Sequence, residues 1–257
     1  FGWQAPDFAH FPMMLAPSGE KLSKRHGSVS VQEYRERGYT PTSVLNYLVR
    51  FGWSHGDQEI FSRQDLIDLF DWQSVNKSDG KFDEKKFADV AFEHLKQENL
   101  TPLEEYVAGV RPFLEKRGLR DVSEDTLRKA IPGIRDRART LVDAAHHLDY
   151  YFREPPELDP KARDKFMTPA AAEHVVALAD ALGGVEPWQP DALEQRFREF
   201  LEQRGVSMKD ASQATRVALS GRSASPPLFE VMAVLGRERS LSRMRRAPAL
   251  VPGAQAG

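Results

Sequence analysis

The sequence predicts an all-α protein made of several helical domains, and three observations support this. Residues that start and end helices recur along the chain, and apolar residues repeat with helical spacing between them. Strand-like runs are scarce, with candidates only at 11–15 and 29–31. We therefore expect about ten helices. The 257 residues, 40% hydrophobic and 29% charged, are enough for two or more domains with buried cores.

Dipeptides of threonine or serine followed by proline mark four of the helix starts. The hydroxyl of an N-cap residue accepts a hydrogen bond from an unpaired helical N–H, and proline is tolerated in the first turn. Apolar residues follow each dipeptide at helical spacing, and three of the four helices end near a glycine. The dipeptides are Thr40-Pro41, Thr101-Pro102, Thr168-Pro169 and Ser225-Pro226.

A long amphipathic helix is predicted from 134 to 148, because apolar residues recur there at intervals of three or four. It stops before the proline pair at 155–156. His146 and His147 lie in it, and we expect them on a partly exposed helix surface. We predict no metal site, because the seven histidines show no ligand-like spacing with carboxylates.

Composition limits the class of protein. No apolar run approaches the roughly 20 residues that span a bilayer, and no signal peptide is visible. The chain contains no cysteine, which excludes disulfides and fits a cytoplasmic protein with no membrane contact. The chain starts at Phe1 without a methionine, and we interpret it as a fragment.

Charge is spread unevenly along the chain, although the formal net charge is only -2. From 128 to 139 five basic residues accompany one acid, and the same ratio recurs from 237 to 246. Local basic faces on a nearly neutral protein suit a polyanion that is contacted along one side.

The sharpest motif is a basic loop at 21–27. Two lysines, a serine and an arginine lie within five residues, and such a loop can place ammonium groups and a hydroxyl around a polyphosphate. The alternative from the residues alone is a solvated basic turn. The loop residues are Lys21, Leu22, Ser23, Lys24 and Arg25.

This loop, together with 8–12, resembles the KMSKS-type loop of class I aminoacyl-tRNA synthetases in the form typical of the glutamyl and glutaminyl branch, and the segments that follow favour glutamyl-tRNA synthetase. Two later segments also resemble that family, in the same order along the chain. The first contains Tyr34, Gly38-Tyr39, Asn46-Tyr47-Leu48, Gly52-Trp53-Ser54, Phe82-Asp83 and Lys85-Lys86, and the second contains 216–221, Ser225-Pro226 and 235–238.

The resemblance implies roles for the loop. Lys24 matches the catalytic lysine that contacts the ATP phosphates during adenylate formation, and Lys21 through Arg25 match the ATP-binding loop. ATP with Mg²⁺ is thus implied for the whole enzyme. The family's second ATP signature, an HIGH-like motif, is not found in this sequence, so we expect no tight ATP binding and no catalysis by this chain alone.

The resemblance also implies anticodon-binding residues. The basic stretch 134–139 resembles a helix that carries an anticodon-reading arginine, and Arg135, Arg137 and Arg139 are all candidates. In a helix, Arg135 and Arg139 would share a face. Arg216, Ser225, Pro226 and Leu228 match residues that contact the first two anticodon bases. Phosphate contact or a solvated face is the alternative for each arginine.

The resemblance implies five segments. Residues 1–30 are expected to be the end of a Rossmann-type catalytic domain and 31–100 a helical domain that contacts the tRNA stem. Residues 101–158 and 159–246 are expected to be two helical anticodon-binding subdomains, and 247–257 a disordered tail. The implied partners are tRNA(Glu) and a missing N-terminal catalytic domain, in a monomeric enzyme.

Three other classes of protein share part of this pattern with a glutamate–tRNA ligase. A stand-alone tRNA-binding or regulatory module has no use for the basic loop, yet it remains the main alternative. Glutaminyl-tRNA synthetase shares the loop but has β-barrel anticodon domains, whereas the chain after 101 reads as helical. A short paralogue that modifies tRNA nucleosides lacks anticodon domains altogether.

Overall fold

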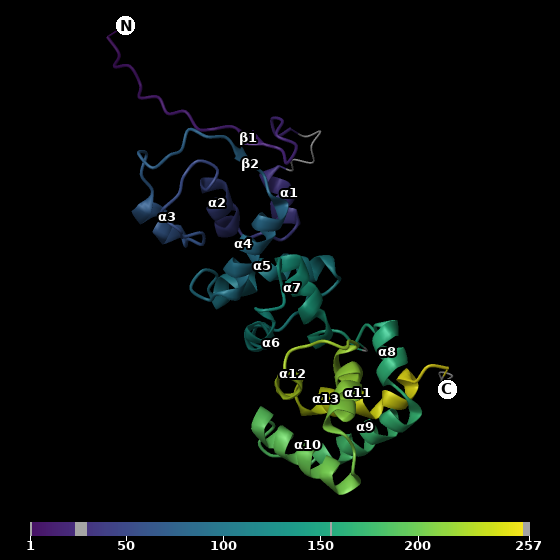
Figure 1. Ribbon diagram of the computed structural model, residues 1–257. Coiled ribbons are helices and arrows are strands. Elements are labelled where there is room, and N and C mark those ends of the chain that lie inside the picture. The colour runs from purple at the N-terminus through teal and green to yellow at the C-terminus, as the bar shows by residue number, and fades with distance from the viewer. Residues whose placement is uncertain (1, 24–29, 155, 254–257) are drawn as a thin grey trace. The chain divides into compact units, whose positions relative to one another are not determined.

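The computed structural model describes residues 2–23, 30–154 and 156–253. The chain divides into two compact units, Phe1–Gly109 with Ala138–Asp143 and Val110–Arg137 with Ala144–Gly257 (Figure 1). The described residues contain helices α1 to α13 and one two-stranded sheet, which confirms the all-α prediction.

The described residues of the first unit form a parallel strand pair and four complete helices. Met14 pairs with Gly80 and Leu15 with Lys81. Helices α5 and α7 contribute residues to both units. The elements are β1 (Met14–Leu15), α1 (Val31–Glu36), α2 (Pro41–Val49), α3 (Arg63–Leu69), β2 (Gly80–Lys81), α4 (Glu84–Lys96), α5 (Leu103–Lys116) and α7 (Leu141–Leu148).

The core of the first unit is rich in aromatic residues. The Tyr47 and Phe87 rings stack with centroids 4.4 Å apart, which joins α2 to α4. The Tyr47 hydroxyl donates to the Asp83 carbonyl and accepts from the Asp83 N–H, at 2.7 and 2.8 Å. Asp83 in turn caps α4, so one buried tyrosine fixes the start of that helix.

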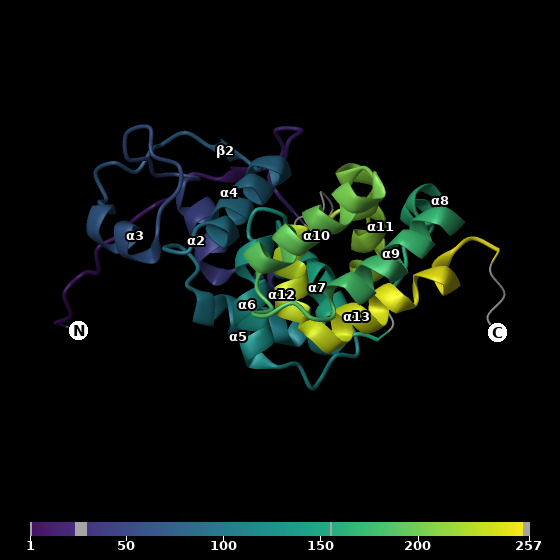
Figure 2. The same ribbon diagram turned by 90° about the horizontal axis from the view of Figure 1, so that it is seen from below.

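The second unit is a helical bundle around α9. Helix α9 contacts α10, α11 and α13, and Figure 2 shows α9 and α13 side by side. The elements are α6 (Glu124–Ala130), η2 (Pro132–Ile134), η3 (Asp149–Tyr151), α8 (Pro160–Phe166), α9 (Pro169–Leu182), α10 (Pro190–Arg204), α11 (Met208–Ser220), α12 (Leu228–Leu235), α13 (Arg237–Arg245) and η4 (Ala247–Leu250). No helix in the described part of the chain has the length and apolarity needed to cross a membrane.

Several sequence-based predictions are confirmed. Thr40 and Thr168 cap α2 and α9 through their hydroxyls, as their Thr-Pro dipeptides predicted. Phe87, Tyr106 and Phe197 were predicted to be packing residues, and each is at most 1% exposed. Helical spacing of apolar residues therefore located the core correctly.

Other element predictions were wrong. The long helix at 134–148 is interrupted, because η2 ends at Ile134, residues 135–140 are not helical, and α7 starts at Leu141. The strand candidate at 29–31 fails at Val31, which begins α1 behind the N-cap Ser30. The tail predicted to be disordered from 247 instead begins with η4, which packs against α9.

Candidate nucleic-acid interface

The turn between α11 and α12 contains two of the predicted anticodon-binding residues, Ser225 and Pro226, and a third, Leu228, begins α12. Ser225-Pro226 was predicted to cap a helix, but α12 starts two residues later, at Leu228. The Ser225 hydroxyl instead donates to the Pro226 carbonyl at 2.9 Å. Ser225, Pro226 and Leu228 are all buried, so a ligand would meet the edge of this turn rather than three exposed side chains.

Arg216 on α11 fixes this turn. Its Nη1 donates to the Ser225 carbonyl at 3.2 Å, to the Pro226 carbonyl at 2.8 Å and to the Ser225 hydroxyl. Its Nε and Nη2 form no hydrogen bond with any residue that the structure describes. Arg216 therefore orders the turn with one nitrogen and keeps donors for a ligand.

The close approach of η2 to Pro226 depends on Gly133. A Cβ at Gly133 would lie 3.0 Å from Cβ and 3.3 Å from Cγ of Pro226. The absence of a side chain there lets the 132–137 segment pack against the turn that carries Ser225. Gly133 was not among the predicted site residues, although the Pro132-Gly133 dipeptide is a turn signal.

The structure separates the three candidate arginines, because 135–140 are not helical. Arg135 is buried, with 8% of its surface exposed. The Arg137 side chain is 36% exposed, and its Nε lies 3.6 Å from the Asp136 carboxylate. Arg139 belongs to the first unit, where it pairs with Asp89 at 3.0 Å and lies over the Phe92 ring. The predicted shared face of Arg135 and Arg139 does not exist.

Arg137 and Arg216 are close enough to interact electrostatically within the second unit. Burial lowers the pKa of Arg216, and the positive charge of Arg137 lowers this pKa further. Two guanidinium groups that repel each other gain from an anion placed near both. This pair is therefore suited to a phosphate or to the acceptor edge of an unstacked base.

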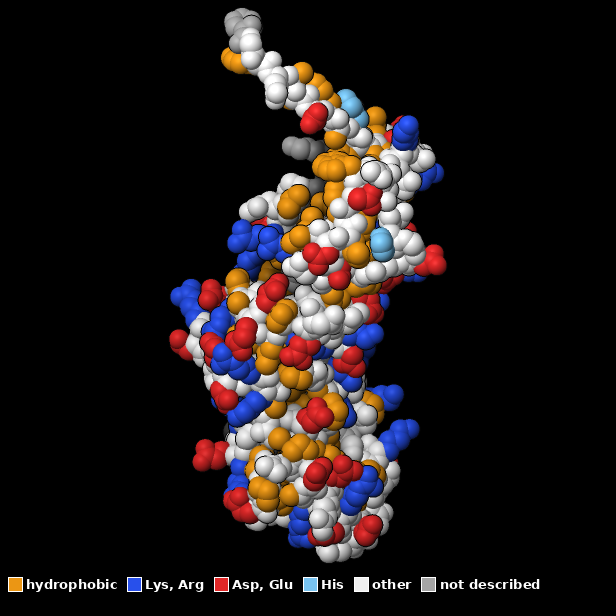
Figure 3. Space-filling view, turned by 90° about the vertical axis from the view of Figure 1, so that its left-hand side faces the viewer, with side chains coloured by type: hydrophobic (Ala, Val, Ile, Leu, Met, Phe, Trp, Pro, Cys, Tyr) orange, Lys and Arg blue, Asp and Glu red, His pale blue; other side chains and the backbone are white. Residues whose placement is uncertain are grey.

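The basic stretches identified in the sequence acquire acidic partners in the fold. Arg128 and Lys129 pair with Glu124 and Asp125, one helical turn earlier in α6. On the face shown in Figure 3, basic and acidic side chains are interspersed over both units. In the second basic stretch, the pairs are Arg237 with Glu186, Arg239 and Arg243 with Glu154, and Arg245 with Asp180. Apart from Arg243, whose side chain is 1% exposed, these arginines are at least partly exposed. Exposed pairs contribute little to stability, so phosphates can replace their carboxylates.

The start of the basic loop lies beside β1 in the first unit. Leu22 N–H donates to the Met14 carbonyl at 2.9 Å, and Lys21 forms a bridge with Leu15. Lys21 is exposed, whereas Leu22 and Ser23 are half-buried. Lys24 and Arg25, including the predicted catalytic lysine, lie outside the described residues.

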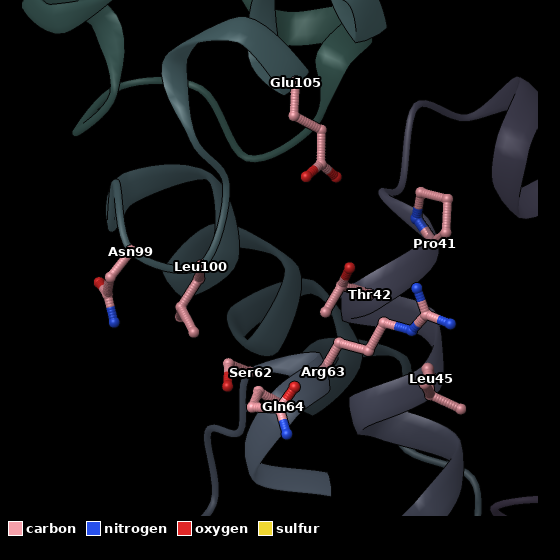
Figure 4. Close-up of a pocket in the computed structure, with 9 residues that line it drawn as sticks. All are labelled: Pro41, Thr42, Leu45, Ser62, Arg63, Gln64, Asn99, Leu100 and Glu105. Carbon is pink, nitrogen blue, oxygen red and sulfur yellow. The ribbon is translucent and has the colours of Figure 1, made fainter. Parts of the chain in front are cut away.

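A separate cavity of about 530 Å³ lies within the first unit (Figure 4). The first turns of α2, α3 and α5 line it, together with 99–100. Its charged residues are Arg63 and Glu105, and none of its nine lining residues was predicted as a site. Among those nine there is no histidine, lysine or second carboxylate, so the cavity has no pair of groups for acid–base chemistry.

Across the described residues, no cluster of three or more histidine, cysteine, aspartate or glutamate side chains could bind a metal ion.

Comparison with known proteins identifies two domain families. Residues 76–248 match the family described as the anticodon binding domain. Residues 1–89 match the catalytic domain of class I tRNA synthetases of the E and Q type. The residues around Arg137 and Arg216 thus lie in a domain whose family binds anticodons.

Individual relatives and solved structures agree with these families. The chain is 38% identical over 250 residues to glutamate–tRNA ligase 1 of Syntrophus aciditrophicus, which covers 97% of this chain and 52% of that protein. It is 39% identical over 249 residues to glutamate–tRNA ligase of Azorhizobium caulinodans, covering 95% and 53%. The crystal structure of a glutamate tRNA ligase from Elizabethkingia meningosepticum matches with a TM-score of 0.79 and 27% identity, over 96% of this chain and 52% of that one.

The chain spans about half the length of the curated relatives it matches. Its family models cover the anticodon-binding part and a stretch of the catalytic domain. The chain therefore belongs to the anticodon binding domain family over most of its length, continues from a stretch of the class I (E and Q) catalytic domain, and is homologous to about half of the glutamate–tRNA ligases it matches.

Proposed function

We propose that this chain is the tRNA-binding part of a glutamate–tRNA ligase and recognises the anticodon of tRNA(Glu). The observation that carries the proposal is the Ser225-Pro226 turn, which Arg216 holds through two carbonyls and against which Gly133 of the 132–137 segment packs, inside the segment that matches the anticodon binding domain. Recognition of unstacked, single-stranded bases requires hydrogen-bond donors next to an apolar surface.

Among the three candidate arginines, we propose that Arg137 and Arg139 contact RNA and that Arg135 has a structural role. The side chain of Arg137 is 36% exposed and its positive charge lowers the pKa of Arg216, and the side chain of Arg139 is 56% exposed. Because the Arg139–Asp89 ion pair is exposed, replacing it with an RNA contact costs little free energy. Arg135 is buried and cannot reach a ligand without a rearrangement.

For the whole enzyme, we propose attachment of glutamate to tRNA(Glu) with ATP and Mg²⁺, through a glutamyl-adenylate. Lys21, Leu22, Ser23, Lys24 and Arg25 belong to the proposed ATP-binding loop, with Lys24 as its catalytic lysine. The proposal includes a stem-contacting domain at 31–100, anticodon subdomains at 101–158 and 159–246, a monomeric state and a cytoplasmic location. A remaining catalytic portion would supply the other half of the ATP site, and this chain alone would not bind ATP tightly.

Fluorescence anisotropy with labelled tRNA tests the proposal. The chain should bind tRNA(Glu) more tightly than the same tRNA with a changed anticodon, and single Arg137→Gln or Arg216→Gln variants should reduce that preference about tenfold. Arg135→Lys should retain the preference if the variant folds, because it preserves the buried charge.

The alternative function is a stand-alone regulatory module that binds tRNA by its shape. Equal affinity for both tRNAs, unchanged by the arginine variants, would contradict anticodon recognition and support that alternative.

A further inference from the structure

Asp149 is the buried centre of a charge cluster that sequence analysis did not detect. Its side chain is 1% exposed, although it carries a carboxylate. One carboxylate oxygen accepts from Arg117 at 2.5 Å, and the other accepts from Arg222 at 2.8 Å. A buried carboxylate between two arginines is costly to form unless both contacts are made, so its geometry is closely determined.

The two arginines come from different elements of the second unit. Arg117 directly follows α5, whereas Arg222 lies in the 221–227 turn that joins α11 to α12. Arg222 also donates to the His146 carbonyl at 2.6 Å, and its guanidinium lies 5.7 Å from the centre of the Tyr150 ring. The beginning of the turn is therefore tied to the end of α7 and to η3.

The far end of the same turn is fixed by Arg216, which donates to the Ser225 and Pro226 carbonyls. We propose that Asp149 is a positioning residue, which acts through Arg222 to place this turn for anticodon binding. This inference rests on the function proposed above for Arg216 and Ser225. Asp149 itself does not face a ligand, because it is buried.

The arginines differ in how much they depend on Asp149. Arg117 has a second carboxylate partner, Glu157, at 3.6 Å. For Arg222, Asp149 is the carboxylate partner that the structure describes. Removing the Asp149 charge would leave the half-buried guanidinium of Arg222 without a described carboxylate partner, whereas Arg117 keeps Glu157. The expected result is a displaced 221–227 turn.

The experiment compares Asp149→Asn, Arg222→Gln and the matched control Arg117→Gln in the 257-residue chain. The control removes one arginine from the cluster but leaves the bond from Arg222 to Asp149. Circular dichroism establishes that each variant is folded, and Arg222→Gln carries the test if Asp149→Asn does not fold. Hydrogen–deuterium exchange of residues 219–228 and RNA affinity are then measured.

We expect faster exchange in this segment for Asp149→Asn and Arg222→Gln, and an unchanged rate for Arg117→Gln. Preference for a tRNA(Glu) anticodon hairpin over one with a changed anticodon should fall about tenfold in the first two variants and less than about twofold in the control.

Unchanged exchange in the first two variants would overturn the proposal, and so would an equal effect of all three, because that would indicate general loss of stability. If the unsubstituted chain shows no anticodon preference, the proposed function fails. In that case the exchange rates still decide whether Asp149 positions the turn.

Discussion

His94 illustrates how a single buried side chain determines the pH response of the first unit. Its Nε2 lies 2.9 Å from Asn46 Oδ1, which also accepts the Phe61 N–H at 2.9 Å. Because Asn46 Oδ1 is an acceptor, Nε2 must carry the proton of the neutral ring. Burial lowers the pKa of His94 from 6.5 to about 4, so the ring is neutral in the folded protein near pH 7.

Acidification should destabilise the first unit through His94. Below pH 6.5 the unfolded chain binds a proton at His94 that the folded chain does not bind until about pH 4. The free energy of unfolding therefore falls as the pH drops through this window, by about 2 kcal/mol at about pH 5. His94→Gln should remove this pH-dependent loss of stability. Urea unfolding at about pH 7 and pH 5 measures it by fluorescence, because Trp3, Trp53 and Trp72 lie in the first unit. An identical pH dependence in the variant would contradict the assignment.

Arg243 plays a comparable structural part in the second unit. Its guanidinium is 1% exposed and donates to the carbonyls of Leu219, Tyr150 and Arg153 and to the Glu154 carboxylate. One planar side chain thus joins the end of α11 to the segment after α7. A lysine has fewer donors and no fixed fork, so it cannot replace all four contacts.

Arg243→Lys should lower the free energy of unfolding by about 2–4 kcal/mol, because buried acceptors lose their donors. The matched control is Arg245→Lys, two residues along the same helix, where an exposed pair with Asp180 should contribute less than about 0.5 kcal/mol. Urea denaturation of both variants measures the difference. Equal destabilisation would show that the buried guanidinium contacts are not what stabilises this region.

At the scale of elements, helix ends decide where the candidate site lies. Helices α10 and α11 both end at a glycine in the left-handed conformation, Gly205 with φ 64° and Gly221 with φ 73°. A Cβ on Gly221 would lie 1.8 Å from the Glu157 carbonyl oxygen, whereas nothing lies within 4 Å at Gly205. The two positions share a conformation and differ in their surroundings.

Alanine at these two glycines should therefore have unequal effects. Gly205→Ala should cost about 1 kcal/mol for the left-handed conformation alone. Gly221→Ala should cost about 3 kcal/mol or more, because backbone of 157–158 must also move. Thermal unfolding, monitored by circular dichroism, compares the stability of the two variants. A similar loss for both would mean that the 157–159 segment moves away easily.

At the scale of the whole molecule, the charge balance limits how RNA is attracted. The formal net charge is -2, and most described arginines of the two basic stretches pair with carboxylates. The protein therefore lacks the strong positive field of a general polyanion binder, and local contacts must supply affinity.

Binding of tRNA should accordingly depend only moderately on salt. We expect a plot of log affinity against log salt concentration to have a slope near -2 to -4, which corresponds to about two to four phosphate contacts. Arg139→Gln should make the slope about one unit shallower if this arginine contacts a phosphate. Anisotropy titrations at several salt concentrations measure both slopes. A slope near -8 would contradict this interpretation and indicate an extended phosphate-binding surface.

The sequence by itself determined the fold class, the family and many helix ends. These features depend on local chemistry, such as the Thr40 and Thr168 hydroxyls that cap helices and the apolar spacing that buries Phe87 and Phe197. Motifs such as the basic loop are also local, so their order along the chain sufficed to indicate the family.

Only the tertiary structure decided which polar residues act together. The helix predicted across 134–148 is broken at 135–140, which are not helical, so helical spacing did not identify which arginine is exposed. Asp149 and Arg222 are 73 residues apart, and Gly133 meets Pro226 across a similar distance in the chain. Such contacts arise from packing between distant segments, and a local pattern contains no information about which distant carboxylate or ring a side chain will meet.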